Sequence, residues 1–200
     1  ARSLSERPVE LWLGGRRLDE RFVINILSPV AFEMHQTRSR QEPISRSNLE
    51  QKILQLLVEK EGLTDKKAEE AARGFIDLIK EQSGLLVERG QDLFGFMHLT
   101  FQEYLAARYL ASKQNRLDLI RRQLHHPHWR EVVLLTSAIL EGDHAATFLE
   151  RIVRVNSPHN EILHRDELLT GWCLADGADA PYSLKKEILG RLIELWSSTS

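Results

Sequence analysis

The sequence contains one clear β-hairpin signal, and it is set among segments with the apolar spacing of helices. Residues 85–89 and 93–98, which are mostly apolar, flank the turn sequence Gly90-Gln91-Asp92. Two such segments separated by a short glycine-containing turn predict an antiparallel hairpin. Because much of the remaining chain carries apolar residues three or four positions apart, this hairpin must belong to a mainly α-helical fold.

Two helices are predicted immediately before the hairpin. Ser47-Asn48-Leu49-Glu50 fits a capping box, and Gly62 is a typical helix stop. A second helix is predicted from Thr64 to Ser83, with a stripe of small and apolar residues facing a core. Residues 37–46 are polar and contain a proline, so we expect them to form a loop before the first of these helices.

A further helix is predicted after the hairpin, from residue 100 to about residue 112. Thr100-Phe101-Gln102-Glu103 fits a second capping box, so we expect Glu103 to have a structural role rather than a catalytic one. Phe101, Tyr104 and Leu105 are expected to form the core face that joins this helix to the hairpin. Two helices, a hairpin and another helix outline a winged-helix unit, which we place at residues 47–112.

The remaining sequence on either side of this unit is also helical in pattern. Residues 1–46 would be the end of a preceding helical region and a linker, in which Ser28-Pro29 predicts the start of a helix that ends near Gln36. Residues 113–200 would form HEAT-like α–α repeats. The helices predicted there span residues 116–124, 128–141, 143–155, 160–175 and 183–197.

The overall charge and cysteine content exclude several classes of protein. The chain has 27 Lys and Arg against 29 Asp and Glu, which gives a net charge of −2 and no overall attraction to nucleic acid or anionic membranes. No apolar run approaches the ~20 residues that a membrane span needs. The single cysteine, Cys173, fits a reducing compartment. We therefore expect a cytoplasmic protein or, since an initiator Met is absent, a piece of a longer chain.

Motifs typical of self-sufficient enzymes are absent from the sequence. It has no P-loop, no glycine-rich dinucleotide motif, no zinc-protease motif and no nucleophile elbow. His125, His126 and His128 cluster around a proline, but no carboxylate or cysteine completes a metal site, so we expect a solvated turn there. Cys173 is expected to be a buried structural thiol because no base is identifiable nearby. We predict no catalytic residue and no metal site.

The charge of the predicted winged helix makes nucleic-acid binding a poor prospect. The candidate recognition helix, residues 64–82, has four basic and five acidic residues, and the hairpin adds a further charge of −1. Nucleic-acid affinity depends on the neutralisation of phosphates, which this surface cannot supply. The most basic stretch, residues 113–131, sums to +3 and is expected to be a solvated helix face.

The most specific motif in the chain is F-x-H-x-x-F-Q-E-Y-x-A-A, at residues 96–107. It resembles the signature near the C-terminal end of the NACHT region in STAND-class signalling NTPases. Three flanking segments are also similar to that family: residues 27–35, the SGLL sequence at residues 83–86, and residues 127–132, which resemble the helix that opens the following repeats. Together these segments cover most of residues 22–140.

The resemblance implies a role for one histidine. His98 would contact the β-phosphate of ADP and hold a closed, inactive state. Its place just before a predicted helix suits that role, because the free N–H groups and partial positive charge of a helix N-terminus favour a phosphate. The motif residues implied to be structural are Phe96, Thr100, Phe101, Glu103 and Tyr104.

The resemblance also implies a function for the whole chain. It would be the nucleotide-sensing and signal-relay region of a NACHT-type ATPase in signal transduction, such as defence or innate immunity, and would not be an enzyme by itself. ADP or ATP with Mg would bind in the parent chain, through an upstream nucleotide-binding domain, and none tightly to these residues alone. The implied partners are that domain, a protein or ligand sensed through the repeats, and further copies on activation.

Two other functions remain open at this point. The chain could be a stand-alone helical scaffold for protein partners, which would need no nucleotide. It could also be a winged-helix nucleic-acid binder, although its charge argues against this.

Overall fold

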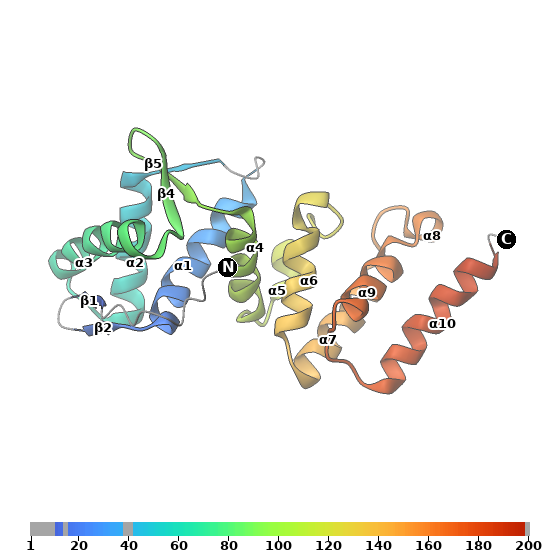
Figure 1. Cartoon of the computed structure of the whole chain (residues 1–200). Helices are drawn as coiled ribbons and strands as arrows, with labels where there is room; N and C mark the ends of the chain where they lie inside the picture. The colour runs from blue at the N-terminus through green and yellow to red at the C-terminus, as the bar shows by residue number, and fades with distance from the viewer. Residues whose placement is uncertain (1–10, 14–15, 38–41, 199–200) are drawn as a thin grey trace. The chain divides into compact units, whose positions relative to one another are not determined.

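A computed structural model describes residues 11–13, 16–37 and 42–198, and the fold in these parts is mainly α-helical, as predicted (Figure 1). The chain divides into two compact units, residues 1–106 and 107–200. The first unit carries all the strands of the described residues, and the second consists of helices and turns.

The first helix, α1 (Glu20–Gln36), is longer than the sequence suggested. Its N-cap is Asp19, whose carboxylate accepts a hydrogen bond of 2.7 Å from the Phe22 amide. The prediction of a helix start at Ser28-Pro29 is wrong, because the helix continues through Pro29. A proline inside a helix leaves the carbonyl four residues earlier without its backbone donor. Here Lys60 Nζ donates to the Asn25 carbonyl over 2.9 Å and replaces that bond.

The helix pair α2 (Arg46–Glu61) and α3 (Asp65–Leu78) follows the predicted pattern closely. Gly62 ends α2 in a left-handed conformation with φ of 63°, as its position in the sequence suggested. The predicted capping box at residues 47–50 is displaced, since the N-cap is Ser45, whose hydroxyl accepts from the Asn48 amide over 3.3 Å. A π-helical turn, η2 (Ile79–Ser83), continues α3 to the predicted end.

The predicted hairpin is confirmed as β4 (Leu86–Gly90) and β5 (Leu93–Phe96), paired antiparallel with Leu86 opposite Phe96. A third strand, β3 (Ile44–Ser45), pairs with the other edge of β5. Residues 38–41 of the expected loop over residues 37–46 lie outside the described part of the chain, and residues 44–45 form a strand. At two residues it is too short to show alternation in the sequence.

A small second hairpin precedes α1. It consists of β1 (Leu11–Leu13) and β2 (Arg16–Leu18), which pair antiparallel. No strands were predicted in this segment from the sequence.

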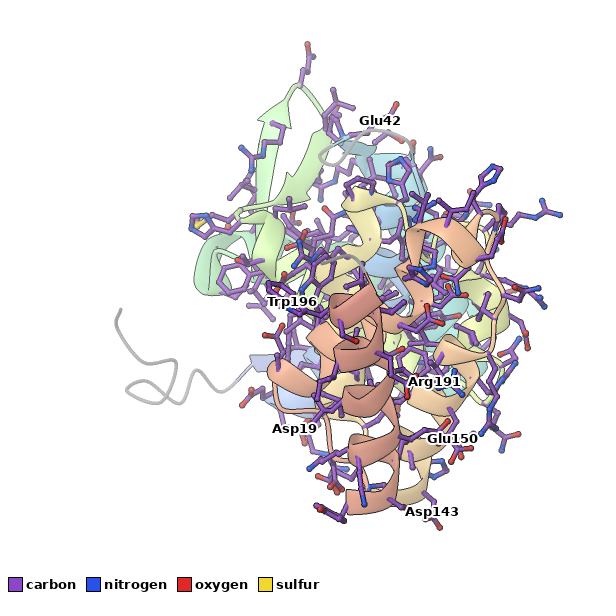
Figure 2. The ribbon with its side chains drawn as sticks, turned by 90° about the vertical axis from the view of Figure 1, so that its right-hand side faces the viewer. Asp19, Glu42, Asp143, Glu150, Arg191 and Trp196 are labelled. Carbon is purple, nitrogen blue, oxygen red and sulfur yellow. The ribbon has the colours of Figure 1, made fainter. Side chains whose placement is uncertain are left out.

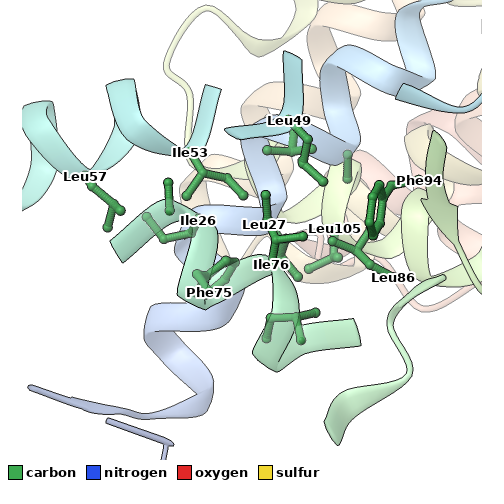
Figure 3. Close-up of a cluster of buried hydrophobic side chains, with 14 of the residues drawn as sticks. Ile26, Leu27, Leu49, Ile53, Leu57, Phe75, Ile76, Leu86, Phe94 and Leu105 are labelled. Atoms are coloured by element: carbon green, nitrogen blue, oxygen red, sulfur yellow. The ribbon is translucent and has the colours of Figure 1, made fainter. Parts of the chain in front are cut away.

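One hydrophobic core joins α1, α2, α3 and the hairpin, and Figure 3 shows its central side chains. The order α1–β3–α2–α3–β4–β5 is that of a winged helix, with α2 and α3 as the helix-turn-helix and β4–β5 as the wing. Helix α1 belongs to this core although it lies in the range 1–46, which we separated from residues 47–112. The domain limits themselves stay a prediction. Fully buried members of the core include Ile26, Leu27, Leu49, Ile53, Phe75, Ile76, Leu86 and Phe94.

Helix α4 (Leu99–Ala111) follows the wing. Leu105 is buried in the winged-helix core, and Phe101 packs against it, as predicted. Tyr104 does not, since it is 40% exposed. Most other residues of α4 are buried or partly buried, on more sides of the helix than a single apolar stripe would cover. Tyr104 and Arg108, which lie one turn apart, form an exposed edge.

The second unit is a succession of helices near the predicted positions. The predicted helix over residues 160–175 is interrupted at His164, which has a φ of 47°. Its HEAT-like character stays a prediction. The observed helices are α5 (Arg116–Ile120), η3 (Pro127–Trp129), α6 (Arg130–Ile139), α7 (Gly142–Val153), α8 (Asn160–Leu163), α9 (Arg165–Ala175) and α10 (Tyr182–Ser198).

Candidate functional site

His98 lies between the end of β5 and the first residue of α4. Its carbonyl accepts a hydrogen bond of 3.1 Å from the Phe101 amide, and its ring lies 5.6 Å from the Phe101 ring at an angle of 53°. Phe101 packs against the winged-helix core. His98 is nevertheless exposed. Phe101 thus holds the backbone on the α4 side of His98, while the imidazole remains accessible.

The start of α4 gives this position a favourable potential for an anion. The helix has 13 residues, which is long enough for aligned peptide dipoles to place partial positive charge at its first turn. The first amide groups of a helix have no acceptor within it, and although the Phe101 amide here donates to His98, the imidazole can add one more donor beside the others. This arrangement can bind a phosphate group presented by another domain.

Arg89, which the sequence motifs did not single out, fixes the segment in front of His98. Its guanidinium donates to the Phe96 carbonyl over 2.8 Å and to the Met97 carbonyl over 3.0 Å. The stem of Arg89 crosses Gly95, where a Cβ atom would lie only 3.2 Å from Arg89 Cγ. Gly95 lies opposite Val87 in the strand register, and Arg89 falls at the irregularity between Glu88 and Gly90, so no sequence pattern indicated this contact.

The other motif residues differ in their burial. Phe96 and Glu103 are buried, with exposures of 4% and 7%, and Phe101 is partly buried. Thr100 is exposed. Since α4 begins at Leu99, Thr100 lies in its first turn and not at the predicted N-cap position. The structure brings Phe101 and His98 into contact, whereas Tyr104 lies on the exposed edge of the helix.

Residues 16–110 match the family described as the winged helix-turn-helix domain C-terminal to NACHT. The matched range contains α1, α2, α3, the three-stranded sheet, His98 and nearly all of α4. This part of the chain is a NACHT-associated winged helix. The resemblance of the sequence to the C-terminal part of a NACHT protein is thereby confirmed. No curated protein and no solved structure shows significant similarity to the chain.

Several cations on the surface of the winged helix are engaged with carboxylates. Arg46 contacts both Glu50 and Asp77, at 2.8 and 2.7 Å. Lys80 Nζ of η2 lies 2.6 Å from Glu88 of the wing, and this hydrogen bond lowers the pKa of the Glu88 carboxyl. Cations paired in this way offer little free charge to a phosphate backbone.

The histidine cluster of the second unit is not a solvated turn. His128 is buried, and His125 Nε2 lies 2.6 Å from Asp166 Oδ1 and 3.0 Å from the Ser157 hydroxyl. Asp166 is fully buried, and its other oxygen accepts from the Ser157 amide over 2.9 Å. The prediction failed because the partners lie more than 30 residues away in the sequence. Asp166 and Ser157 both contact the same nitrogen of His125, so the group is a structural network and not a relay through the imidazole.

Cys173 is fully buried, as predicted for a structural thiol. Burial raises its pKa to about 11, so the thiolate needed for nucleophilic chemistry is scarce at neutral pH. Among the residues that the structure describes, no three His, Cys, Asp or Glu side chains are grouped as metal ligands. In the same residues, every helix is too short or too polar to cross a lipid bilayer.

Proposed function

We propose that this winged helix is the nucleotide-state switch of a NACHT-type signalling ATPase, and that His98 is its contact with the nucleotide. The observation that carries the proposal is the exposed imidazole at the start of α4, on a fixed backbone, within the matched family range. The region is not catalytic by itself. It controls the conversion of an ADP-bound inactive state into an ATP-bound active state.

In this proposal the phosphates of ADP are held jointly by two parts of one chain. The upstream nucleotide-binding domain supplies the P-loop and the Mg site, and the nucleotide supplies negative charge at its terminal phosphate. His98 Nδ1–H or Nε2–H donates one hydrogen bond to that phosphate, and the first turn of α4 adds its partial positive charge. Loss of this contact on exchange for ATP releases the winged helix and shifts a two-state equilibrium.

Arg89 acts as a positioning residue in this scheme. By bonding two successive carbonyls just before His98, it restricts the path by which β5 leads into α4. A switch contact of one hydrogen bond contributes little unless its donor is already in place, since ordering it on binding would cost conformational entropy.

The second unit is proposed to relay partner binding to the switch as a set of HEAT-like repeats. The parent protein would then be a cytoplasmic signalling or defence protein that forms oligomers on activation. Nucleic-acid binding is not part of this proposal, because acidic residues outnumber basic ones in α3 and the wing, and Arg46 and Lys80 are paired with carboxylates.

The test is the nucleotide retained by the full-length protein on purification. His98→Leu removes the donor from an exposed position and should leave the fold intact, while His144→Leu, at an exposed histidine of α7 in the second unit, is the matched control. We expect the His98 variant to lose most of its bound ADP and to signal without a trigger. Equal ADP content in both variants and the parent protein would exclude the proposed contact.

A further inference from the structure

Arginine side chains gather in the second unit where α5 lies against α7. The residues of these two helices and of the turns that follow them line a cavity of about 220 Å³. Three arginines contribute to its wall, Arg121, Arg151 and Arg154, and so do the carboxylates of Asp118 and Glu150. Cations therefore outnumber anions in the wall of this cavity.

Two of the arginines are paired with the two carboxylates, but these pairs lie in solvent. Arg151 Nη2 lies 3.0 Å from Asp118 Oδ1, and the two side chains are 43% and 55% exposed. Arg154 Nη1 lies 3.7 Å from Glu150 Oε2, and these side chains are 62% and 44% exposed. Ion pairs with this much exposure contribute little to stability, so a stronger acceptor can displace either carboxylate.

Two further arginines have no carboxylate partner within the part of the chain that the structure describes. Arg121 is one of them, and it is exposed. Arg116 is the other, although it is buried: its Nη2 donates to the Ala111 carbonyl over 3.1 Å, and its Nε has no hydrogen-bond partner in the described residues. Burial and the nearby positive charge of Arg151 lower the pKa of the Arg116 guanidinium. The potential beside the cavity is therefore positive, which favours an anion.

We propose that the cavity between α5 and α7 is a binding site for a phosphomonoester, whose oxygens are contacted by Arg121, Arg151 and Arg154. A phosphomonoester carries a charge of about −1.5 to −2 at pH 7 and three acceptor oxygens. Each guanidinium can donate two parallel hydrogen bonds to such a group. Leu117 and Val155 form the apolar part of the wall, and apolar neighbours strengthen hydrogen bonds to a charged group.

The carboxylates in the wall favour this ligand over other anions. A ligand carboxylate would be no stronger an acceptor than Asp118 and Glu150, which it would have to displace. Nucleic acid presents one charge per phosphate along an extended chain, and the same two carboxylates would repel the phosphates next to the bound one. A single phosphoryl group with two charges avoids both difficulties. The site lies outside the matched range 16–110 and does not depend on the proposed role of His98.

Calorimetric titration of the 200-residue chain with phenyl phosphate tests the proposal. We expect one site with a dissociation constant of about 0.1–1 mM, and an increase of at least about 10-fold in Arg121→Gln. The matched control is Arg122→Gln, because Arg122 is the adjacent exposed arginine and does not line the cavity. It should leave the dissociation constant unchanged, and both variants should unfold at the same urea concentration as the parent chain.

Removal of a competing carboxylate should strengthen the site. Asp118→Asn releases Arg151 from its ion pair, so we expect the dissociation constant for phenyl phosphate to fall by about 3- to 10-fold. Asp143→Asn is the matched control, since it makes the same change of charge on α7 outside the cavity. Figure 2 labels Asp143 together with Glu150, which lies about two turns further along this helix. The control should bind phenyl phosphate as the parent chain does.

A glycine–alanine peptide with one phosphoserine distinguishes the two possible sources of the phosphoryl group. Tighter binding of this peptide than of phenyl phosphate, lost in Arg121→Gln, would support the proposal with a phosphorylated protein segment as the source. Similar affinities would support it with a small phosphate ester as the source.

Three results would each overturn the proposal. The first is no binding of phenyl phosphate at about 20 mM. The second is binding of benzoate, which has the same ring and a single carboxylate, as tight as that of phenyl phosphate. The third is an equal loss of affinity in Arg121→Gln and Arg122→Gln, and if single-stranded DNA then bound more tightly than phenyl phosphate, the surface would be a general one for polyanions.

Discussion

At the scale of single residues, Pro29 and Lys60 show how a local rule is satisfied by a distant partner. Pro29 cannot donate a backbone hydrogen bond, and its ring disfavours a helix interior. The Asn25 carbonyl instead accepts from Lys60 Nζ at the end of α2. The proline therefore does not end α1, and α1 remains one of the three helices that form the core.

Lys60→Met should lower the free energy of unfolding by about 1 kcal/mol, because it removes the donor to the Asn25 carbonyl. The same substitution in a chain that also carries Pro29→Ala should cost much less, since the introduced alanine supplies its own backbone N–H. Urea unfolding of the four chains gives the coupling between the two sites. Lys66→Met on the exposed surface of α3 is the control. If Lys60→Met lowered the free energy of unfolding equally with and without Pro29, the loss would not come from the bond to the Asn25 carbonyl.

Cys173 should be unreactive in the native chain at pH 8, because burial raises its pKa to about 11 and excludes reagents. Because the pKa is raised, protonation of the Cys173 thiol also stabilises the fold. The folded pKa lies above the unfolded value, so this contribution is complete below about pH 9 and is lost as the pH rises through 11. The measurement is the rate of labelling by an aromatic disulfide with and without urea. Rapid labelling of the native chain would contradict the burial.

At the scale of elements, segments with strong local signals were predictable. Gly62 marks the end of α2 with a left-handed residue, and the glycine turn between two apolar segments marks the wing. Elements that depend on distant partners were not. Strand β3 exists because its two residues pair with β5 nearly 50 positions later, and α1 passes Pro29 because of Lys60.

The same division applies to the candidate site. His98 could be found from its motif, whereas Arg89 could not, because its role lies in two hydrogen bonds to backbone carbonyls. Tyr104 was misplaced because helical spacing does not say how many sides of a helix are covered. Similarly, the buried ring of contacts around Asp166 involves residues from three separate segments.

Asp166→Ala should destabilise the chain by about 3 kcal/mol. It removes the acceptor of the Ser157 amide and the partner of His125 from a fully buried position. Asp166→Asn should lose less, because an amide oxygen can still accept one of these bonds. Glu161→Gln on the exposed side of α8 is the control for a lost carboxylate. A loss below about 0.5 kcal/mol for Asp166→Ala, measured by chemical denaturation, would show that the network does not hold the α8 segment.

At the scale of the whole molecule, the family match falls almost entirely on the first of the two units. The first contains the family's winged helix almost entirely, since the match covers residues 16–110 and the unit ends at residue 106. The second, residues 107–200, lies almost wholly beyond the match.

The dissociation rate of ADP from the full-length protein tests the central claim most directly. A fluorescent ADP analogue, displaced by excess ADP, gives this rate for the parent protein, His98→Leu, His98→Gln and the control His144→Leu. Loss of one hydrogen bond to a charged phosphate should increase the rate by about 10- to 100-fold in His98→Leu, with a smaller increase in His98→Gln, which keeps a donor. An unchanged rate in His98→Leu would contradict the account.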